Sequence, residues 1–139
     1  MRQTQLIYTS RPFGYDATTL NDILFQARRN NKRDGITGAL ICRDDIFLQL
    51  LEGQGAEVTA AFARILRDQR HDEVELLSVT DVDTRLFPQW EMRHDPVRTW
   101  MWTPDQVHAG AVRKASVNEL RQVFARIAKE PPEEFGGVV

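Results

Sequence analysis

Three uncharged polar side chains stand at positions where the neighbouring pattern calls for apolar ones. Tyr8 lies in the first apolar run of the chain, Gln49 lies in the third, and Asn31 continues the apolar stripe of a helical segment. A carboxamide offers a hydrogen-bond donor and an acceptor, and a buried tyrosine hydroxyl needs a partner. Burying such a group unpaired costs about 1–3 kcal/mol. Together they predict an enclosed polar ligand with an edge of donors and acceptors.

Each of these residues, taken alone, also has a purely structural explanation. Gln49 would satisfy a neighbouring backbone group, Tyr8 would find an amide within the core, and Asn31 would end its helix, where asparagine is common. These alternatives stay open, although a coincidence of all three is less expected than any one of them.

Residue types that perform enzyme chemistry do not gather in a recognisable order. No Ser-His-Asp or Cys-His constellation is evident, and no pair of carboxylates occupies predicted core positions. Gly53-Gln54-Gly55 lacks the further glycines and the lysine of a phosphate-binding loop. Cys42 is the only cysteine and the three histidines are isolated, so we expect no disulfide and no metal site. The sequence predicts a protein that is not an enzyme.

Length and composition limit the remaining classes. The 139 residues, 42% of them hydrophobic and 27% charged, fit one folded domain. Eighteen basic residues balance twenty acidic ones, which does not favour direct nucleic-acid binding. The chain shows neither a run of about 18 apolar residues nor the apolar region of a signal peptide. We therefore expect no membrane span and a cytoplasmic location.

Hydrophobic periodicity changes several times along the chain and defines the elements that position the polar residues. The expected order is strand 5–10, a helix that follows Asp16 and ends near residues 31–32, strands 35–42 and 46–52, a helix from 58 to about 68, and strands 74–82 and 90–94. In the third strand Phe47, Gln49 and Leu51 share one face. This order predicts an α+β fold, a ferredoxin-like sandwich with a five-stranded mixed sheet and two helices on one face.

The segment after Pro96 carries two clear helix start signals. Thr103-Pro104-Asp105-Gln106 offers an N-cap followed by proline, and Ser116 to Glu119 forms a capping box. The second helix has one apolar side, which consists of Val117, Leu120, Val123, Phe124 and Ile127. We expect these C-terminal helices to cover the other face of the sheet. The expected organisation is a core of residues 1–95, a helical extension of residues 96–130 and a flexible tail of residues 131–139.

An ordered set of motifs over residues 4 to 95 resembles the BLUF family of blue-light photoreceptors. The motifs are Leu6-Ile-Tyr-Thr-Ser10, Asn30-Asn31, Gly35-Ile-Thr-Gly-Ala-Leu40, Phe47-Leu-Gln-Leu-Leu-Glu-Gly53, Asp68-Gln-Arg-His71 and Phe87-Pro-Gln-Trp-Glu-Met92. Each motif alone is weak, but the ordered set is specific. The resemblance implies a non-covalently bound FAD whose flavin ring lies between the two helices.

The resemblance also implies roles for individual residues. Asn31 would bind the pyrimidine edge of the flavin, and Tyr8 and Gln49 would form the photoactive pair. The implied cofactor contacts are Ile23, Phe47, Leu51 and Ile65 along the ring, Asn30 and Asn31, Gln49, the Asp68, Arg70 and His71 segment, and Arg28 near a phosphate.

The family mechanism, carried over, transfers an electron and a proton from Tyr8 to the excited flavin. The Gln49 side chain then flips or tautomerises, which exchanges its donor and acceptor and gives a red-shifted state. Family members pass the change to a strand that here would carry Trp90 and Met92, and which of these two lies beside the flavin is left open. Longer family members carry an output domain such as a cyclase or phosphodiesterase, and none is recognisable here after Met92. We therefore expect signalling through residues 103–129, which carry an apolar stripe, to a separate, unidentified protein partner, and a homodimer is also kept open.

Two alternatives from other classes remain. One is a ferredoxin-like interaction or regulatory module in which Tyr8, Gln49 and Asn31 serve only packing. The other is a small hydrolase of the acylphosphatase type, for which Arg11 is the only candidate arginine in a suitable first loop. Both would be colourless, so bound flavin separates them from a photoreceptor.

Overall fold

A five-stranded mixed sheet forms the middle layer of the structure, a computed structural model that describes residues 2–14 and 16–132. Its spatial order is β4-β1-β3-β2-β5, with antiparallel neighbours except for the parallel pair β2 and β5. The strands are β1 (Gln3–Pro12), β2 (Thr37–Arg43), β3 (Ile46–Gly53), β4 (His71–Val82) and β5 (Arg93–Pro96). The predicted five-stranded mixed sheet is confirmed.

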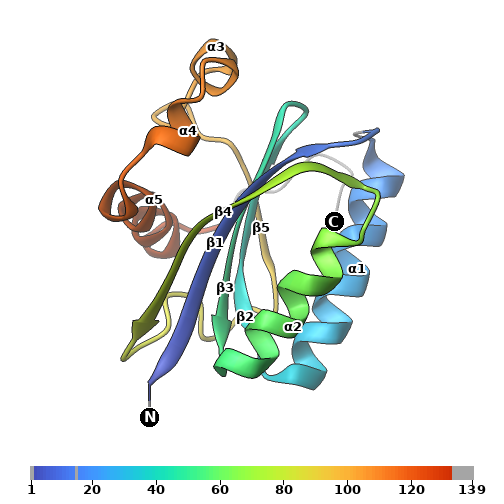
Figure 1. The fold of residues 1–139 in the computed structure, drawn as a ribbon, viewed down its shortest axis with the longest axis vertical. Helices are drawn as coiled ribbons and strands as arrows, with labels where there is room; N and C mark the ends of the chain where they lie inside the picture. The colour runs from blue at the N-terminus through green and yellow to red at the C-terminus, as the bar shows by residue number, and fades with distance from the viewer. Residues whose placement is uncertain (1, 15, 133–139) are drawn as a thin grey trace.

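Two helices, α1 (Ala17–Asp34) and α2 (Gly55–Leu66), cover one face of this sheet (Figure 1). Asp16 is the N-cap of α1, and its carboxylate accepts from the Thr19 N–H at 2.7 Å. Gly35 is the C-cap and has a φ of 70°, which favours glycine. The prediction that this helix ends near residues 31–32 is therefore wrong. Asn31 lies inside the helix and is 3% exposed, so it is not a terminal cap.

The opposite face is covered by the C-terminal helices α3 (Pro104–His108), α4 (Ala111–Lys114) and α5 (Val117–Lys129), as predicted (Figure 1). Both capping boxes form, one at Thr103 and one at Ser116. Leu120, Phe124 and Ile127 of α5 join the core on this face. Two details differ: the short helix α4 was not expected, and Val117 is 43% exposed because it stands in the first turn of α5, away from the sheet.

Residues of β3 alternate between these two cores. Phe47 and Leu51 belong to the cluster under α1 and α2, whereas Ile46, Leu48 and Leu50 belong to the cluster under α5. Gln49 pairs with Tyr8 of β1 on one side and with Leu40 of β2 on the other, and it is 5% exposed. Since paired residues on adjacent strands share a face, Gln49 lies on the α1 and α2 side, as the alternation predicted.

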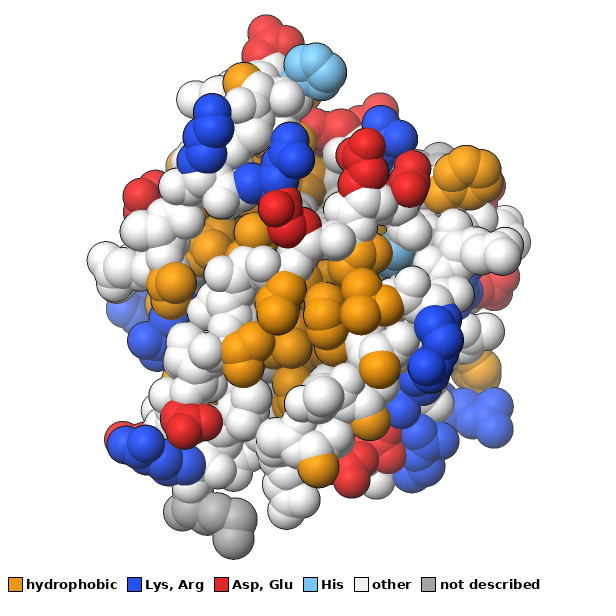
Figure 2. Space-filling view, in the orientation of Figure 1, with side chains coloured by type: hydrophobic (Ala, Val, Ile, Leu, Met, Phe, Trp, Pro, Cys, Tyr) orange, Lys and Arg blue, Asp and Glu red, His pale blue; other side chains and the backbone are white. Residues whose placement is uncertain are grey.

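The boundaries of the last two strands differ from the predictions. β4 begins at residue 71 rather than 74. The prediction missed its first residues because the charged side chains of Asp72, Glu73 and Glu75 interrupt the apolar alternation of the strand. β4 is an edge strand, and charged residues are common there. Its residues Leu76 and Val79 are exposed, and Figure 2 shows apolar side chains gathered near the centre of this view.

The predicted strand 90–94 is wrong in position, since β5 covers residues 93–96. Trp90 and Met92 therefore precede the strand. The Trp90 N–H bonds to the Phe87 carbonyl at 3.2 Å and the Trp90 carbonyl accepts from Gly38 at 3.0 Å, which fixes a turn rather than a strand.

Two further expectations concern the chain outside the sheet. Of the expected flexible tail, residues 133–139 lie outside the described residues, and the division at residue 95 stays a prediction. Among the helices in the described part of the chain, none has the length and apolar character to cross a membrane.

Candidate functional site: a pocket between two helices

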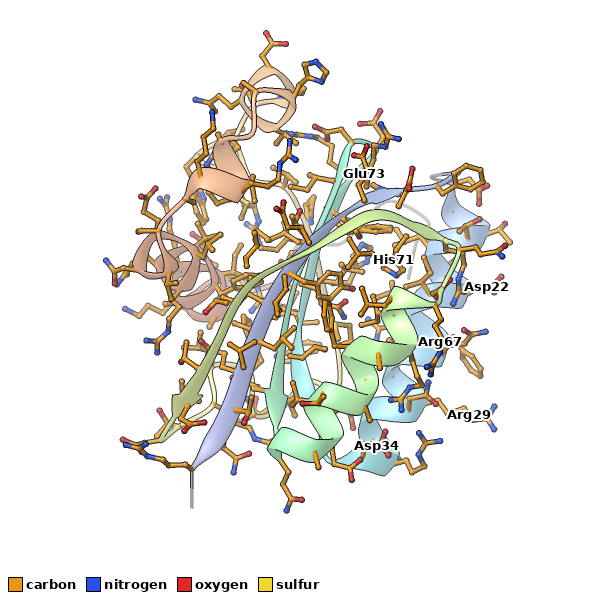
Figure 3. The ribbon with its side chains drawn as sticks, viewed as in Figure 1. Asp22, Arg29, Asp34, Arg67, His71 and Glu73 are labelled. Atoms are coloured by element: carbon orange, nitrogen blue, oxygen red, sulfur yellow. The ribbon has the colours of Figure 1, made fainter. Side chains whose placement is uncertain are left out.

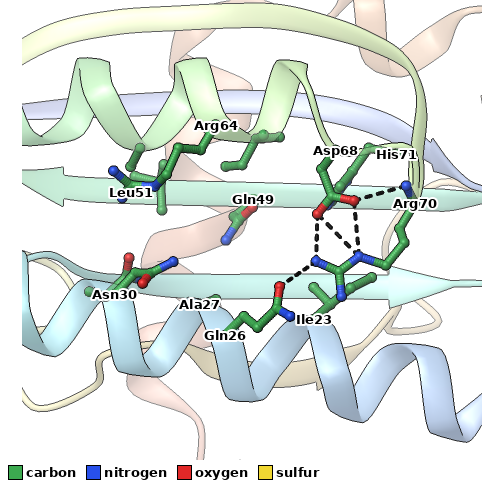
Figure 4. Close-up of a pocket in the computed structure, with 13 residues that line it drawn as sticks. Ile23, Gln26, Ala27, Asn30, Gln49, Leu51, Arg64, Asp68, Arg70 and His71 are labelled. Carbon is green, nitrogen blue, oxygen red and sulfur yellow. Dashed lines mark hydrogen bonds and ion pairs between the residues drawn. The ribbon is translucent and has the colours of Figure 1, made fainter.

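A cavity of about 290 Å³ opens between α1 and α2 above the middle of β3 (Figure 4). This volume is near the lower end of the roughly 300–1,000 Å³ of small-molecule sites. Its walls come from α1, from β3, and from α2 with the segment that follows it. The lining residues are Ile23, Gln26, Ala27, Asn30, Asn31, Gln49, Leu51, Ala61, Arg64, Ile65, Asp68, Arg70 and His71.

The structure brings most of the predicted contact residues to this one cavity. Those that line it are Ile23, Asn30, Asn31, Gln49, Leu51, Ile65, Asp68, Arg70 and His71. Four others lie behind the lining: Phe47 packs against His71 with a ring distance of 5.1 Å, Tyr8 and Met92 contact Gln49, and Arg28 contacts the backbone of Met92. Trp90 is 38% exposed and does not line the cavity.

Tyr8, Gln49 and Met92 form a continuous hydrogen-bonded chain beneath the pocket. The Tyr8 hydroxyl donates to Gln49 Oε1, and Gln49 Nε2 donates to Met92 Sδ at 3.2 Å. Burial raises the pKa of Tyr8 far above its usual value, and the charge of Asp68 raises it further, so the phenol keeps its proton. A thioether is a weak acceptor. The amide of Gln49 is therefore firmly held at its oxygen end and loosely held at its nitrogen end.

α1 holds the segment before β5 through two side-chain contacts. Asn31 Nδ2 donates to the Glu91 carbonyl at 2.7 Å, and Arg28 Nε donates to the Met92 carbonyl at 3.1 Å. The expected position of Arg28 beside a phosphate does not agree with this arrangement, because its guanidinium faces the backbone of Met92 rather than the cavity. Asn31 uses one end of its amide for Glu91, which leaves its Oδ1 available on a cavity-lining side chain.

The segment after α2 supplies the charged groups of the pocket. Arg70 binds the Asp68 carboxylate at 2.6 Å, and Ser10 Oγ lies 2.9 Å from His71 Nδ1. Burial opposes ionisation of Asp68, but the hydrogen bonds from Arg70 outweigh it and lower the Asp68 pKa. Burial lowers the pKa of His71 to about 4, so this ring is neutral at pH 7. His71 lies inside, between sheet and helices, whereas Arg29 projects outward (Figure 3).

Two polar contacts cross from α1 to the α2 side of the cavity, and Figure 4 shows the first of them, between Arg70 and Gln26. At one end Arg70 donates to Gln26 Oε1 at 2.7 Å, and at the other Arg64 donates to Asp34 Oδ2 at 3.1 Å. We call these contacts the two clasps. They bridge the helices on either side of the opening.

Four lining residues were missed by the sequence reasoning: Gln26, Ala27, Ala61 and Arg64. The signal was present, since Gln26 and Ala27 stand one turn from Ile23 and one turn from Asn30 on α1, and Ala61 and Arg64 stand likewise beside Ile65 on α2. The small side chains of Ala27 and Ala61 fit the pattern of ordinary core residues, and the polar Gln26 and Arg64 stand beside the apolar stripes rather than on them.

The cavity walls fit the parts of a flavin cofactor. Ile23, Leu51 and Ile65 offer apolar surface for the faces of a flat ring. Gln49 and Asn31 present amide groups from the floor and from one wall, as the hydrogen-bonding edge of a flavin requires. Arg64 and Arg70 at the ends of the opening are cations suited to phosphate oxygens. Within residues 2–14 and 16–132, no group of three His, Cys, Asp or Glu side chains could hold a metal ion.

Arg11, the arginine required by the hydrolase alternative, does not reach this site. It pairs with Asp72 at 3.0 Å on the exposed end of β1 and β4, and it does not line the cavity. The arginine is therefore engaged in an exposed pair between two strands.

Several photoreceptor proteins are similar to this chain in sequence. The photoactivated adenylate cyclase subunit alpha of Euglena gracilis is 28% identical over 92 residues, which are 66% of this chain and 9% of that protein. Subunit beta of Euglena longa is 30% identical over 113 residues, 81% of this chain and 12% of that protein. The chain thus spans about a tenth of the length of these cyclases.

Solved structures match nearly the whole chain. The photo-activated state of BlsA has a TM-score of 0.81 at 24% identity, and the match covers 96% of this chain and 99% of that one. The dark state of BlrB, a BLUF protein, has a TM-score of 0.74 at 26% identity and covers 91% and 96% of the two chains. The first likeness shows the fold, and the second links that fold to a BLUF protein.

The family model described as sensors of blue light using FAD matches residues 3–93. These residues contain the whole sheet up to the start of β5, both helices of the cavity and every residue that lines it. This chain therefore belongs to the BLUF family of blue-light sensors that use FAD.

Proposed function

We propose that the cavity between α1 and α2 holds the flavin ring of FAD, and that the chain from Tyr8 through Gln49 to Met92 is the light-dependent switch. The observation that carries this proposal is the position of Gln49. It is the one lining residue that is also bonded to both Tyr8 and Met92. A rearrangement of this amide would change its contacts with the ligand, with Tyr8 of β1 and with Met92 before β5.

The remaining lining residues have separate tasks in this proposal. Ile23, Leu51 and Ile65 hold the ring in place through apolar contact, and Phe47 supports His71 from behind. Asn30 and Asn31 bind the polar edge with their amides.

Asp68 and Arg70 form a neutralised pair, so the pocket gains little net charge from them. Arg64, at the other end of the cavity, receives the phosphates, a task that falls to it in place of Arg28, which is turned toward Met92.

The flavin, when bound, supplies absorption of blue light and accepts an electron in its excited state. Tyr8 is the electron donor, and its hydroxyl proton leaves along the hydrogen bond to Gln49 Oε1. The amide of Gln49 then rotates or tautomerises, because its nitrogen end is held only by the weak acceptor Met92 Sδ. Electron and proton both return to Tyr8, so no residue is consumed. The changed hydrogen bond persists and would shift the absorption of the flavin slightly to the red.

The output proposed for these 139 residues is a protein contact rather than a reaction. The C-terminal helices lie on the sheet face opposite the pocket, where a separate protein partner can reach them. The expected cytoplasmic location and the alternative of a homodimer stay predictions. The cyclase activity in the names of the Euglena proteins belongs to chains about ten times longer.

A spectrum of the purified protein tests the proposal. After incubation with FAD and removal of free ligand, we expect a yellow protein with oxidised-flavin bands and a reversible red shift under blue light. A protein that retains no flavin under these conditions, or that binds it without any shift, would refute the proposed function.

A further inference from the structure

A chain of charged side chains connects β5 to the end of α5 beneath the surface of the molecule. Asp95 is fully buried and binds Arg93 at 2.7 Å and Arg98 at 2.8 Å. Arg98 then binds Glu130 at 3.1 Å. Glu130 is the C-cap residue of α5 and also accepts from Arg126 at 3.4 Å. We call Arg93, Asp95, Arg98 and Glu130 the ion chain.

The ion chain begins next to the proposed switch. Arg93, its first member, follows Met92 directly and is 2% exposed. Arg93 and Asp95 pair with Ala39 and Ile41 of β2, both of which belong to the core under α5. The side chain of Met92, in contrast, belongs to the core under α1 and α2. The neighbouring side chains at 92 and 93 therefore lie on opposite faces of the sheet, Met92 on the pocket face and Arg93 on the face of the C-terminal helices.

The burial of these charges makes the ion chain sensitive to small displacements. A buried carboxylate is tolerated only with good hydrogen-bond geometry, and losing one partner leaves an uncompensated charge. Asp95 has two arginine partners whose positions depend on different segments, β5 for Arg93 and the following loop for Arg98. If β5 shifts, the position of Asp95 relative to Arg98 changes. Arg98 must then either follow Asp95 or lose its ion pair with Glu130.

Other links between the sheet and the C-terminal helices do not start at the switch. Glu75 of β4 pairs with Arg113 of α4 at 3.6 Å, and both side chains are about half exposed. Gln5 of β1 accepts from Arg121 at 3.1 Å. Neither contact involves β5 or a neighbour of Met92. Two ring contacts also reach α5 from this part of the chain, Phe87 with Phe124 at 6.3 Å and Trp100 beneath Arg126 at 3.9 Å. Among the described residues, the ion chain is the charged link that starts directly beside Met92 and ends on α5.

We propose that the ion chain transmits the rearrangement at Gln49 to the C-terminal end of α5, so that Glu130 and the last turn of α5 form the light-dependent part of a protein-binding surface. The proposal rests on the proposed function, since it needs a light-driven change at Gln49. In the dark, Asp95 and Glu130 both hold Arg98. In the lit state, displacement of the backbone at Met92 and Arg93 weakens the ion pairs of Arg98 with Asp95 and Glu130, and the last turn of α5 becomes less stable.

The experiment compares three forms of the full chain loaded with FAD: wild type, Glu130→Gln and Glu75→Gln. Glu130 is chosen because its side chain is 30% exposed, so the variant keeps a buried Asp95 paired with both arginines. Glu75→Gln is the matched control, because it also removes one carboxylate that joins the sheet to a C-terminal helix. The measurements are the flavin spectrum in dark and light, and amide hydrogen exchange of residues 126–130 in both states.

We expect light to speed amide exchange at residues 126–130 of the wild type by roughly two- to fivefold, the range of a partly exposed ion pair. Glu130→Gln should keep the red shift but exchange at the faster rate already in the dark. Glu75→Gln should behave as the wild type.

Two results would overturn the proposal while leaving the proposed function intact. One is a wild type with a normal red shift but no light-dependent exchange in residues 126–130. The other is a light response in Glu130→Gln equal to that of the wild type. A wild type that shows no red shift removes the proposed function and this proposal together, and the spectrum alone identifies that case.

Discussion

Gln49 donates its amide N–H to the sulfur of Met92 at 3.2 Å, across the gap between β3 and the segment before β5. An oxygen acceptor in this place would hold the amide about as firmly as the Tyr8 hydroxyl holds its other end. Sulfur is a weak acceptor on a flexible and polarisable side chain. Gln49 is therefore firmly held at its oxygen end and weakly held at its nitrogen end, as the proposed switch requires.

Replacing Gln49 with leucine removes both hydrogen bonds and keeps the approximate volume. We expect Gln49→Leu to retain FAD, because the apolar walls and Asn31 are unchanged, and to lose the reversible red shift completely. Absorption spectra before and after blue light provide the measurement. Gln122→Leu, on the exposed side of α5, is the control and should shift normally. A normal photocycle in Gln49→Leu would contradict the proposed switch.

Tyr8→Phe removes the hydroxyl that donates to Gln49 Oε1 and leaves the ring in the core. The amide oxygen then lacks its buried partner, so the free energy of unfolding should fall by about 1–3 kcal/mol. Urea denaturation measures this change, and spectra of the same variant should show no normal red shift. An unchanged stability would mean that the Tyr8 hydroxyl does not hold the amide.

The two clasps across the cavity should control how fast the cofactor leaves. Gln26→Ala removes the bond from Arg70 to α1 without altering the cavity floor. We expect FAD to dissociate roughly two- to fivefold faster, as suits a single exposed polar contact, with an unchanged spectrum. The rise of free-flavin fluorescence after dilution gives the rate. Gln69→Ala, exposed and outside the cavity lining, serves as control, and equal rates in both variants would refute the role of the clasp.

Stability should fall as the pH is lowered from about 6.5 to about 4. Burial lowers the pKa of His71 from 6.5 to about 4, and burial lowers that of His94 likewise. Between these values the unfolded chain binds a proton that the native state does not, so the free energy of unfolding rises with pH, by at most about 1.4 kcal/mol per pH unit for each histidine.

Urea denaturation at pH 6.5, 5.5 and 4.5 measures this slope. His71→Gln should lower it, whereas Gln69→Ala, an exposed substitution that removes no titratable group, should leave it unchanged. A slope in His71→Gln as steep as that of the wild type would show that His71 is not the group that resists protonation.

Much of the site followed from strand alternation. Because side chains alternate strictly along β1 and β3, the sequence placed Tyr8 and Gln49 on the pocket face, and the register then paired them directly. The order of elements and two capping boxes were likewise local signals, and they predicted both layers of helices correctly.

Long-range side-chain contacts could not be predicted in this way. The direction of Arg28 toward the Met92 carbonyl depends on how α1 lies over a segment 64 residues away. β4 and β5 were misplaced because charged residues on edge strands do not show the alternation of a half-buried strand. The burial of Arg93 and Asp95 was not predicted either, because charged residues are expected at the surface unless their partner is known.

The alternation along β3 assigns its odd-numbered residues to the pocket face and its even-numbered residues from 46 to 50 to the core under α5. Substitutions at positions 49 and 51 change the cavity lining, and those at 47 change the support of His71 behind it. Substitutions at 46, 48 and 50 change the core on which α5 packs. Colour, lifetime and quantum yield can therefore evolve on one set of positions while the choice of partner evolves on the other. An engineer who wishes to attach this light sensor to a new recipient would redesign the even-numbered positions and α5, and leave the odd-numbered ones untouched.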